Sequence, residues 1–141
     1  MEKKLIIRGQ RNNNPLNIKT SKAKWVGKVS DPALKKDKTF EEFDTMVNGI
    51  RAAIKLIQNY IKSGYNTVDT IVHRWCPDGT APAYQRMVHR EMAKNIGDHD
   101  PLKPIRRDDY STLFVLVAAM AWIESIYRIS EQEFSEAWNA L

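Results

Sequence analysis

Residues 110–125 read YSTLFVLVAAMAWIES, and this stretch decides how we expect the chain to fold. Apolar side chains fill its positions from Leu113 to Ile123, so a helix built from them has no polar side. Such a helix belongs in the interior of a domain. The run is too short to cross a bilayer, which needs about 20 apolar residues. We therefore expect a helix from about Tyr110 to Ser125 at the centre of the fold.

Amphipathic helices are expected on both sides of this stretch. In residues 43–62 apolar side chains recur every three or four positions, and Gly64 ends the pattern. The same spacing predicts helices over residues 66–75 and 82–95. The sequence SEQE at residues 130–133 has the spacing of a capping box and predicts the start of a C-terminal helix.

The segment from Asn17 to Phe43 has a different pattern. Gly27, Pro32 and several Ser/Lys clusters divide it into short pieces, which predicts a small β-hairpin or a three-stranded meander. A chain of 141 residues supports one adequate core. The prediction is a single mainly α (α+β) domain over residues 1–141, with a small N-terminal β-hairpin and a flexible leader at residues 1–8.

Composition restricts the partners and the compartment. The net charge of +5 and the pI of about 9.4 favour anionic partners such as nucleic acid, anionic lipid or an acidic bacterial wall. The basic residues do not form one block, and no nucleic-acid-binding motif is present, so nucleic acid is not the favoured partner. The single cysteine, Cys76, excludes an internal disulfide and is expected to be a half-buried core thiol. Without a signal peptide, we expect synthesis in the cytoplasm.

Carboxylates are the best candidates for catalysis. His73, His89 and His99 are far apart in sequence, so we expect no metal site and no cofactor. Glu124 follows the most apolar stretch, where burial would raise the pKa of a carboxyl group and suit it to general-acid work. The alternative is a buried acid paired with Arg51 or Arg128. Further acids cluster where the N-terminal segment meets the first long helix: Asp37, Glu41, Glu42 and Asp44. For Glu41 and Asp44, which lie near the start of that helix, capping is the alternative role.

Amides and aromatic residues supply a possible sugar site. The stretch RGQRNNNPLNIK, residues 8–19, is either a polar loop or a surface that hydrogen-bonds hydroxyl-rich and amide-rich groups. Aromatic faces beside amides suit a saccharide, which has apolar C–H faces and hydroxyl groups. Trp25, Trp75 and Tyr84 lie in or beside loops, with core packing as the alternative for each tryptophan.

The same stretch carries a family resemblance. RNNNPLNI resembles the RNNNPGNI signature of small lysozyme-like cell-wall proteins of phages and bacterial mobile elements. The resemblance continues over about residues 8–125, through WVG, DKTFEEF, NGIRAA and IVHRWCP to Glu124. Two features depart from the family. Leu16 stands where the signature has Gly, and we expect no helix ahead of the Asn tract to supply the Glu that longer relatives use.

The resemblance implies a lysozyme-like fold and cleavage of the peptidoglycan β-1,4 bond, as in a muramidase, lytic transglycosylase or endolysin. Glu124 would be the general acid and Asp37 the second carboxylate, with Glu41 as a further candidate. The expected sugar-binding residues are Arg11, Asn12, Asn13, Asn14, Asn17, Trp25, Trp75 and Tyr84. Such a protein would reach the wall after lysis or as a virion component. The alternative is a non-catalytic peptidoglycan-binding or virion structural protein that keeps the fold.

Overall fold

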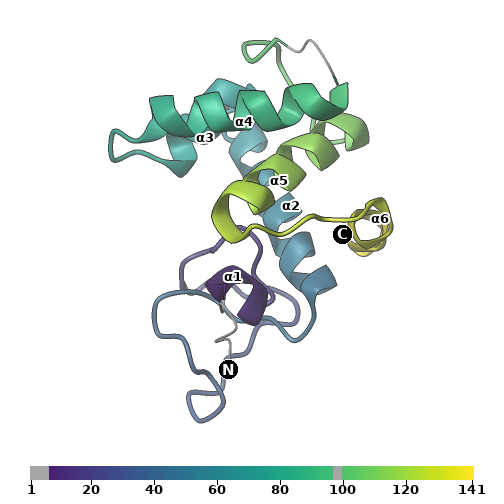
Figure 1. Cartoon of the computed structure of the whole chain (residues 1–141). Coiled ribbons are helices and arrows are strands. Elements are labelled where there is room, and N and C mark those ends of the chain that lie inside the picture. Colours follow the sequence, from purple (N-terminus) through teal and green to yellow (C-terminus); the bar gives the residue numbers. More distant parts are fainter. Residues whose placement is uncertain (1–6, 97–99) are drawn as a thin grey trace, which may run out of the picture.

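The computed structural model describes residues 7–96 and 100–141 (Figure 1). Six helices are present in these ranges: α1 (Arg8–Arg11), α2 (Met46–Lys62), α3 (Val68–Trp75), α4 (Ala81–Ile96), α5 (Tyr110–Ser125) and α6 (Glu131–Asn139). The protein is therefore mainly α, as expected. Residues 1–6 of the expected leader lie outside the described residues, and Arg8, its last residue, already belongs to α1.

The central position of α5 is confirmed. It packs against α1, α2 and α4. Helix α6 packs on α2, and helix α3 packs on α4. In Figure 1, α3 and α4 lie at one end of α2 and α5, and the N-terminal segment lies at the other end. Leu113, Leu116 and Met120 are fully buried because α5 has neighbours on several sides.

Local sequence signals set the ends of the helices. Thr45 and Thr67 accept backbone N–H groups at the starts of α2 and α3, and Asp109 does so for α5. The capping box predicted at Ser130 is present, with Glu133 as its second member. Each cap satisfies a backbone donor that has no partner within its own helix.

The expected β-hairpin is not formed. Residues 17–43 contain two isolated antiparallel bridges, Lys19–Phe40 and Lys28–Phe43. The reason is that side chains occupy backbone groups that a β-ladder would use. The Asn14 amide donates to the carbonyls of Ile18 and Glu41, and its oxygen accepts the Ile18 N–H. The pairing of the two segments therefore stays short.

Candidate active site

Amide side chains hold the C-terminal end of α5. Gln10 Nε2 donates to the carbonyls of Ser125 and Ile126 at 2.9 and 3.2 Å, and Asn17 Nδ2 donates to the Glu124 carbonyl at 3.1 Å. The Ser125 hydroxyl donates in turn to the Pro15 carbonyl at 2.8 Å. The last carbonyls of a helix lack partners within the helix, so these amides supply what α5 requires. They also fix the backbone that carries Glu124.

Most of the Asn turn (residues 12–17) faces inward. Asn12 and Asn14 are 2% and 0% exposed, and Asn12 Nδ2 donates to Asp37. Asn13 Nδ2 donates to the Phe43 carbonyl at 3.1 Å. These three amides serve the fold, and in the described part of the chain they do not line the groove that contains Glu124, in contrast to the expected role in sugar binding. Asn17 differs, because it lines a groove beside Glu124.

The turn also explains why Leu16 is tolerated in place of the signature's glycine. Within the turn, two residues have positive φ, Asn13 at 51° and Asn17 at 53°. Asparagine adopts this left-handed conformation more readily than other residues with a side chain. Leu16 is fully buried in the core and does not adopt a positive φ.

Glu124 lies in a groove of about 500 Å³ between the N-terminal segment, α2 and the end of α3. The groove brings together four of the expected site residues: Glu124, Asn17, Trp25 and Trp75. Its other lining residues are Ile18, Lys19, Ser21, Phe40, Leu56, Tyr60, Arg74 and Pro77. A half-buried carboxylate thus shares one surface with two tryptophans and an amide.

Trp75 orients the carboxylate. Its indole Nε1 donates to Glu124 Oε2 at 3.0 Å. The two arginines considered as partners lie elsewhere, since Arg51 donates to the Ala140 carbonyl and Arg128 pairs with Glu91. Among the described residues, no basic side chain forms an ion pair with Glu124. Because a carboxylate oxygen has two lone pairs, the indole bond leaves acceptor capacity for a ligand.

Tyr84 lies behind the groove. Its side chain is buried, and its hydroxyl has no hydrogen-bond partner of regular geometry among the described residues. Burial raises the pKa of this phenol far above its usual value, and the charge of Glu124 adds to the effect. Tyr84 is therefore a neutral neighbour of the acid. It does not line the groove, although sequence analysis placed it among the sugar-binding residues.

Asp37, the expected second carboxylate, lies outside this groove. Arg8 binds it in a bidentate manner at 2.6 and 2.7 Å, and Arg11 approaches at 3.2 Å. Asn12 and the backbone N–H groups of Thr39 and Phe40 complete its hydrogen bonds. These donors hold the pKa of Asp37 well below its usual value, and the Arg8 guanidinium has the largest effect. Asp37 and Arg11 therefore stabilise the N-terminal segment.

Glu41 is also engaged within the fold. Its carboxylate is fully buried and forms an ion pair with Lys28 Nζ at 2.8 Å. The same ammonium group donates to the carbonyls of Ser21 and Ala23. Removing one partner of such a pair would leave an uncompensated buried charge. Glu41 does not line the groove.

The other reactive residues do not suggest a different chemistry. Burial raises the pKa of the Cys76 thiol, which disfavours the nucleophilic thiolate. His73 is exposed on α3, and His89 contacts Asp69 at 2.8 Å, while His99 lies outside the described residues. In residues 7–96 and 100–141 no group of metal-binding side chains gathers. No helix in these ranges has the length and apolar character to cross a bilayer.

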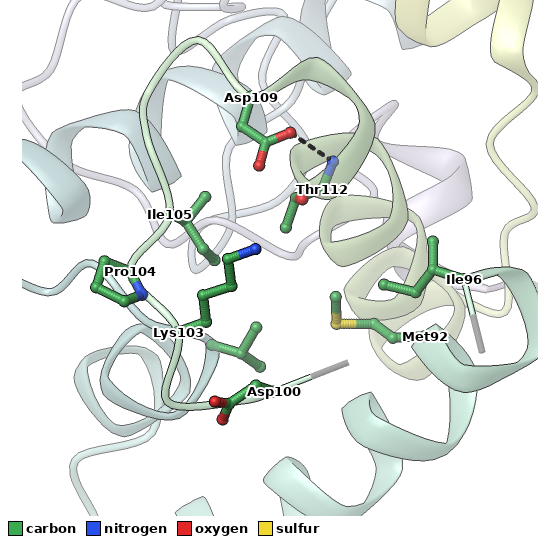
Figure 2. A pocket seen from close by; sticks show the side chains of 9 residues that line it. Met92, Ile96, Asp100, Lys103, Pro104, Ile105, Asp109 and Thr112 are labelled. Atoms are coloured by element: carbon green, nitrogen blue, oxygen red, sulfur yellow. Dashed lines mark hydrogen bonds between the residues drawn. The ribbon is translucent and has the colours of Figure 1, made fainter. Parts of the chain in front are cut away.

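A second hollow lies at the opposite end of the bundle (Figure 2). Apolar side chains from α4 and the following loop line it, together with Asp100, Lys103 and Asp109. Asp109 already caps α5 through the Thr112 N–H. Two of its lining residues, Ile96 and Asp100, flank residues 97–99 in the sequence, which are outside the described part of the chain, so we assign the hollow no function.

Eight groove residues were not predicted as site residues, and three of them carry groups that could contact a ligand. Tyr60 and Lys19 line the groove, as does Arg74, whose guanidinium lies 5.1 Å from the centre of the Tyr60 ring. Tyr60 belongs to the apolar stripe of α2, and Arg74 belongs to the IVHRWCP motif. Their positions in these patterns were the available signals, but neither pattern tells which residue faces a ligand.

Comparison with known proteins gives one informative similarity. No protein-family model matches the chain. Over 75 residues it is 45% identical to Protein P5 of Pseudoalteromonas phage PM2. The matched region covers 50% of this chain and 45% of that protein, so the chain spans about half the length of the curated relative it matches. The chain is thus similar to a phage protein.

Proposed function

We propose that the protein is a lysozyme-like enzyme that cleaves the glycan strands of peptidoglycan, with Glu124 as the general acid. The observation that carries this proposal is the position of Glu124 in a groove that also contains Trp25 and Trp75. A carboxylic acid beside a glycosidic bond can protonate the leaving oxygen. The similarity to a phage protein fits an enzyme that reaches the wall after lysis or as a virion component.

The aromatic residues suit a sugar ligand. Trp25, Trp75 and Tyr60 offer flat apolar faces along the groove, against which the C–H faces of a pyranose ring can pack. Substrate held there would lie beside Glu124, because Trp75 contacts that carboxylate directly. Binding and protonation would then take place on the same surface.

Two polar atoms in the groove residues favour an amide-bearing sugar. Asn17 Oδ1 and Trp25 Nε1 are buried and have no hydrogen-bond partner among the described residues. An unpaired buried polar group costs about 1–3 kcal/mol, and a ligand would recover part of this cost once a side-chain rotation turned the atom toward it. An N-acetylated sugar has both a donor and an acceptor. Peptidoglycan strands consist of such sugars.

Among the described residues only one carboxylate, Glu124, lines the groove. Retaining and inverting glycosidases usually employ two, and substrate-assisted enzymes are an exception. A single acid suits a reaction in which a group of the substrate itself attacks the anomeric carbon. Such a reaction ends either in hydrolysis or in intramolecular transglycosylation. The products distinguish these two outcomes, because hydrolysis adds one water molecule to the cleaved strand and intramolecular transglycosylation adds none.

The first prediction concerns Glu124→Gln. The glutamine retains an acceptor for the Trp75 N–H but cannot donate a carboxyl proton, so the fold is expected to persist while activity falls at least 100-fold. Release of muropeptides from purified peptidoglycan, followed by mass spectrometry, measures this loss. Glu136→Gln, at an exposed position on α6, is the matched control and is expected to keep full activity.

The same assay separates the alternative function. The single carboxylate in the groove is also compatible with a non-catalytic protein that binds peptidoglycan or builds the virion. If the unchanged protein sediments with peptidoglycan but releases no muropeptides, the enzyme proposal is wrong and the binding function replaces it. If Glu124→Gln retains activity, the acid has been assigned to the wrong residue.

A further inference from the structure

A second surface, which we name the basic hollow, lies beside the groove. It has a volume of about 500 Å³ and is lined by Arg8, Arg11, Lys36, Asp37, Lys38 and Thr39. Four of these side chains are cationic and one is a carboxylate. The surface therefore has a surplus of three positive charges.

The negative charge of Asp37 is directed into the protein. Its side chain has no exposed surface, and both oxygens accept bonds from Arg8, Arg11, Asn12 and backbone N–H groups. The side chains of Arg8 and Arg11 are about half exposed, at 48% and 49%. A guanidinium has five N–H donors, and Asp37 uses only some of them. Donors remain on the exposed sides of both arginines.

Lys36 and Lys38 supply the other two charges. Both side chains are exposed, and neither forms an ion pair within the described part of the chain. The neighbouring Lys35 is different, because its ammonium group donates to the carbonyls of Asp37 and Phe40. The loop is thus held by Lys35, while Lys36 and Lys38 stay available to an anion.

Phe40 connects the hollow with the groove. Phe40 lines the groove, and the guanidinium of Arg8, a residue of the hollow, lies 4.6 Å from the centre of the Phe40 ring. The backbone makes the same connection, since Lys19, in the groove, is bridged to Phe40, and Thr20 is bonded to Thr39, in the hollow. A branched ligand could therefore occupy both surfaces at once.

We infer that the basic hollow binds the carboxylates of the stem peptides attached to the glycan strand in the groove. This inference rests on the proposed function. Peptidoglycan is a branched polymer with neutral sugar rings along the strand and acidic peptides beside it. The neutral, aromatic groove suits the first part, and the adjoining cationic hollow suits the second. Exposed charge pairs of this kind contribute modestly to affinity but favour one substrate over another.

A nucleic acid fits the hollow less well. Proteins that bind single strands combine cations with aromatic faces on which bases stack. Among the described residues, no aromatic side chain lines the hollow. The nearby ring of Phe40 is covered by the Arg8 guanidinium, at 4.6 Å from its centre. DNA is therefore included in the test as a competing ligand.

The test compares two fluorescent glycan fragments of equal length, one with stem peptides and one from which an amidase has removed them, with the freed lactyl carboxylates converted to neutral amides. Binding is measured by anisotropy in the Glu124→Gln background, so that the fragments are not cleaved. We expect tighter binding of the fragment with peptides. Lys36→Gln/Lys38→Gln is expected to reduce this preference about five-fold. Salt is expected to reduce it further, because exposed charges are screened.

The control is Lys62→Gln/Lys103→Gln, which removes the same charge from exposed positions outside both surfaces and should leave the preference unchanged. If both fragments bind equally to the parent protein, the hollow does not bind stem peptides, although the proposed function stands. If neither fragment binds, both proposals fail. If Lys36→Gln/Lys38→Gln loses affinity for DNA and keeps the preference for the fragment with peptides, the hollow binds nucleic acid and our inference is wrong.

Discussion

At the scale of single residues, Asp37 shows how the N-terminal segment is stabilised. Its carboxylate accepts bonds from two arginines, one asparagine and two backbone N–H groups. These bonds favour the ionised form and hold its pKa well below the usual value of about 3.9. Asp37 thereby joins α1 to the loop of residues 36–40 without contributing to the groove.

We predict that Asp37→Asn destabilises the protein at pH 7 by about 2 kcal/mol, since several charge-assisted bonds are lost while half-exposed arginines remain partly hydrated. Because the folded pKa is lowered, the stabilisation is complete above about pH 4 and is lost as the pH falls toward the folded pKa. The variant should therefore lose less stability than the unchanged protein between pH 5 and pH 2. Urea unfolding across this range measures the difference.

The exposed pair of Arg106 and Asp108 provides the control for this effect. Both side chains are largely exposed, and Asp108→Asn should change stability by less than 1 kcal/mol at any of these pH values. An Asp37→Asn variant as stable as this control would show that the buried carboxylate contributes nothing.

At the scale of elements, the Asn turn fits between α1, α2 and α5 at close approach. A Cβ atom built on Gly49 of α2 would lie 1.7 Å from the Asn13 carbonyl oxygen, and one on Gly9 would lie 1.8 Å from Ser125 Oγ. Glycine is required at position 49 because the helix meets the Asn13 backbone there, and at position 9 because the Ser125 side chain occupies the space. The turn thus determines the distance between α2 and the end of α5 that carries Glu124.

Gly49→Ala tests this contact. Alanine favours helix over glycine by about 1 kcal/mol, but the clash with backbone cannot be relieved by a side-chain rotation. We expect a net destabilisation of at least 2 kcal/mol, since overpacking in well-packed sites costs about 1–3 kcal/mol or more. The urea midpoint measures it. Asn59→Ala, an exposed position on the same helix, should be neutral or slightly stabilising.

The elements differ in how well the sequence predicts them. The periodic apolar residues of α2 and α5 and the capping box at Ser130 act locally, and all three predictions are confirmed. The β-hairpin was wrong because the amide of Asn14 occupies backbone groups from two distant segments. Whether an asparagine faces a ligand or its own backbone depends on tertiary neighbours, which composition does not reveal.

At the scale of the whole molecule, the core near α6 is separate from the groove. Phe134 of α6 is fully buried, and its ring lies 4.9 Å from that of Phe114 and 5.2 Å from that of Tyr110. Trp138 stacks on Phe134, with ring centres 6.0 Å apart. None of these residues lines the groove.

Phe134→Ala should therefore lower stability by about 3–5 kcal/mol and leave the activity of the folded fraction unchanged. Thermal unfolding and muropeptide release, measured at a temperature where the variant is folded, test the two parts separately. Phe134→Leu fills more of the space and should cost less. A loss of specific activity in a folded variant would show that α6 influences the groove.

The candidate site, like the hairpin, depends on tertiary neighbours that the sequence does not reveal. Glu124, Trp25, Trp75 and Asn17 were identified from residue type and a family pattern, and the structure brings them into one groove. Asp37 met the same criteria, but its side chain faces two arginines. Its neighbour Arg8 seemed to belong to a leader. Their pairing spans 29 positions in the chain, which no local pattern encodes.

The bond from the Trp75 indole to Glu124 has a consequence for how such a groove could be altered. A change at Trp75 aimed at a new sugar preference would also release the acid from its orientation, so affinity and turnover would change together. Trp25 has no contact of this kind with the carboxylate and can be varied with less risk. Natural variation and directed evolution should both find new specificities first on the side of the groove formed by Trp25.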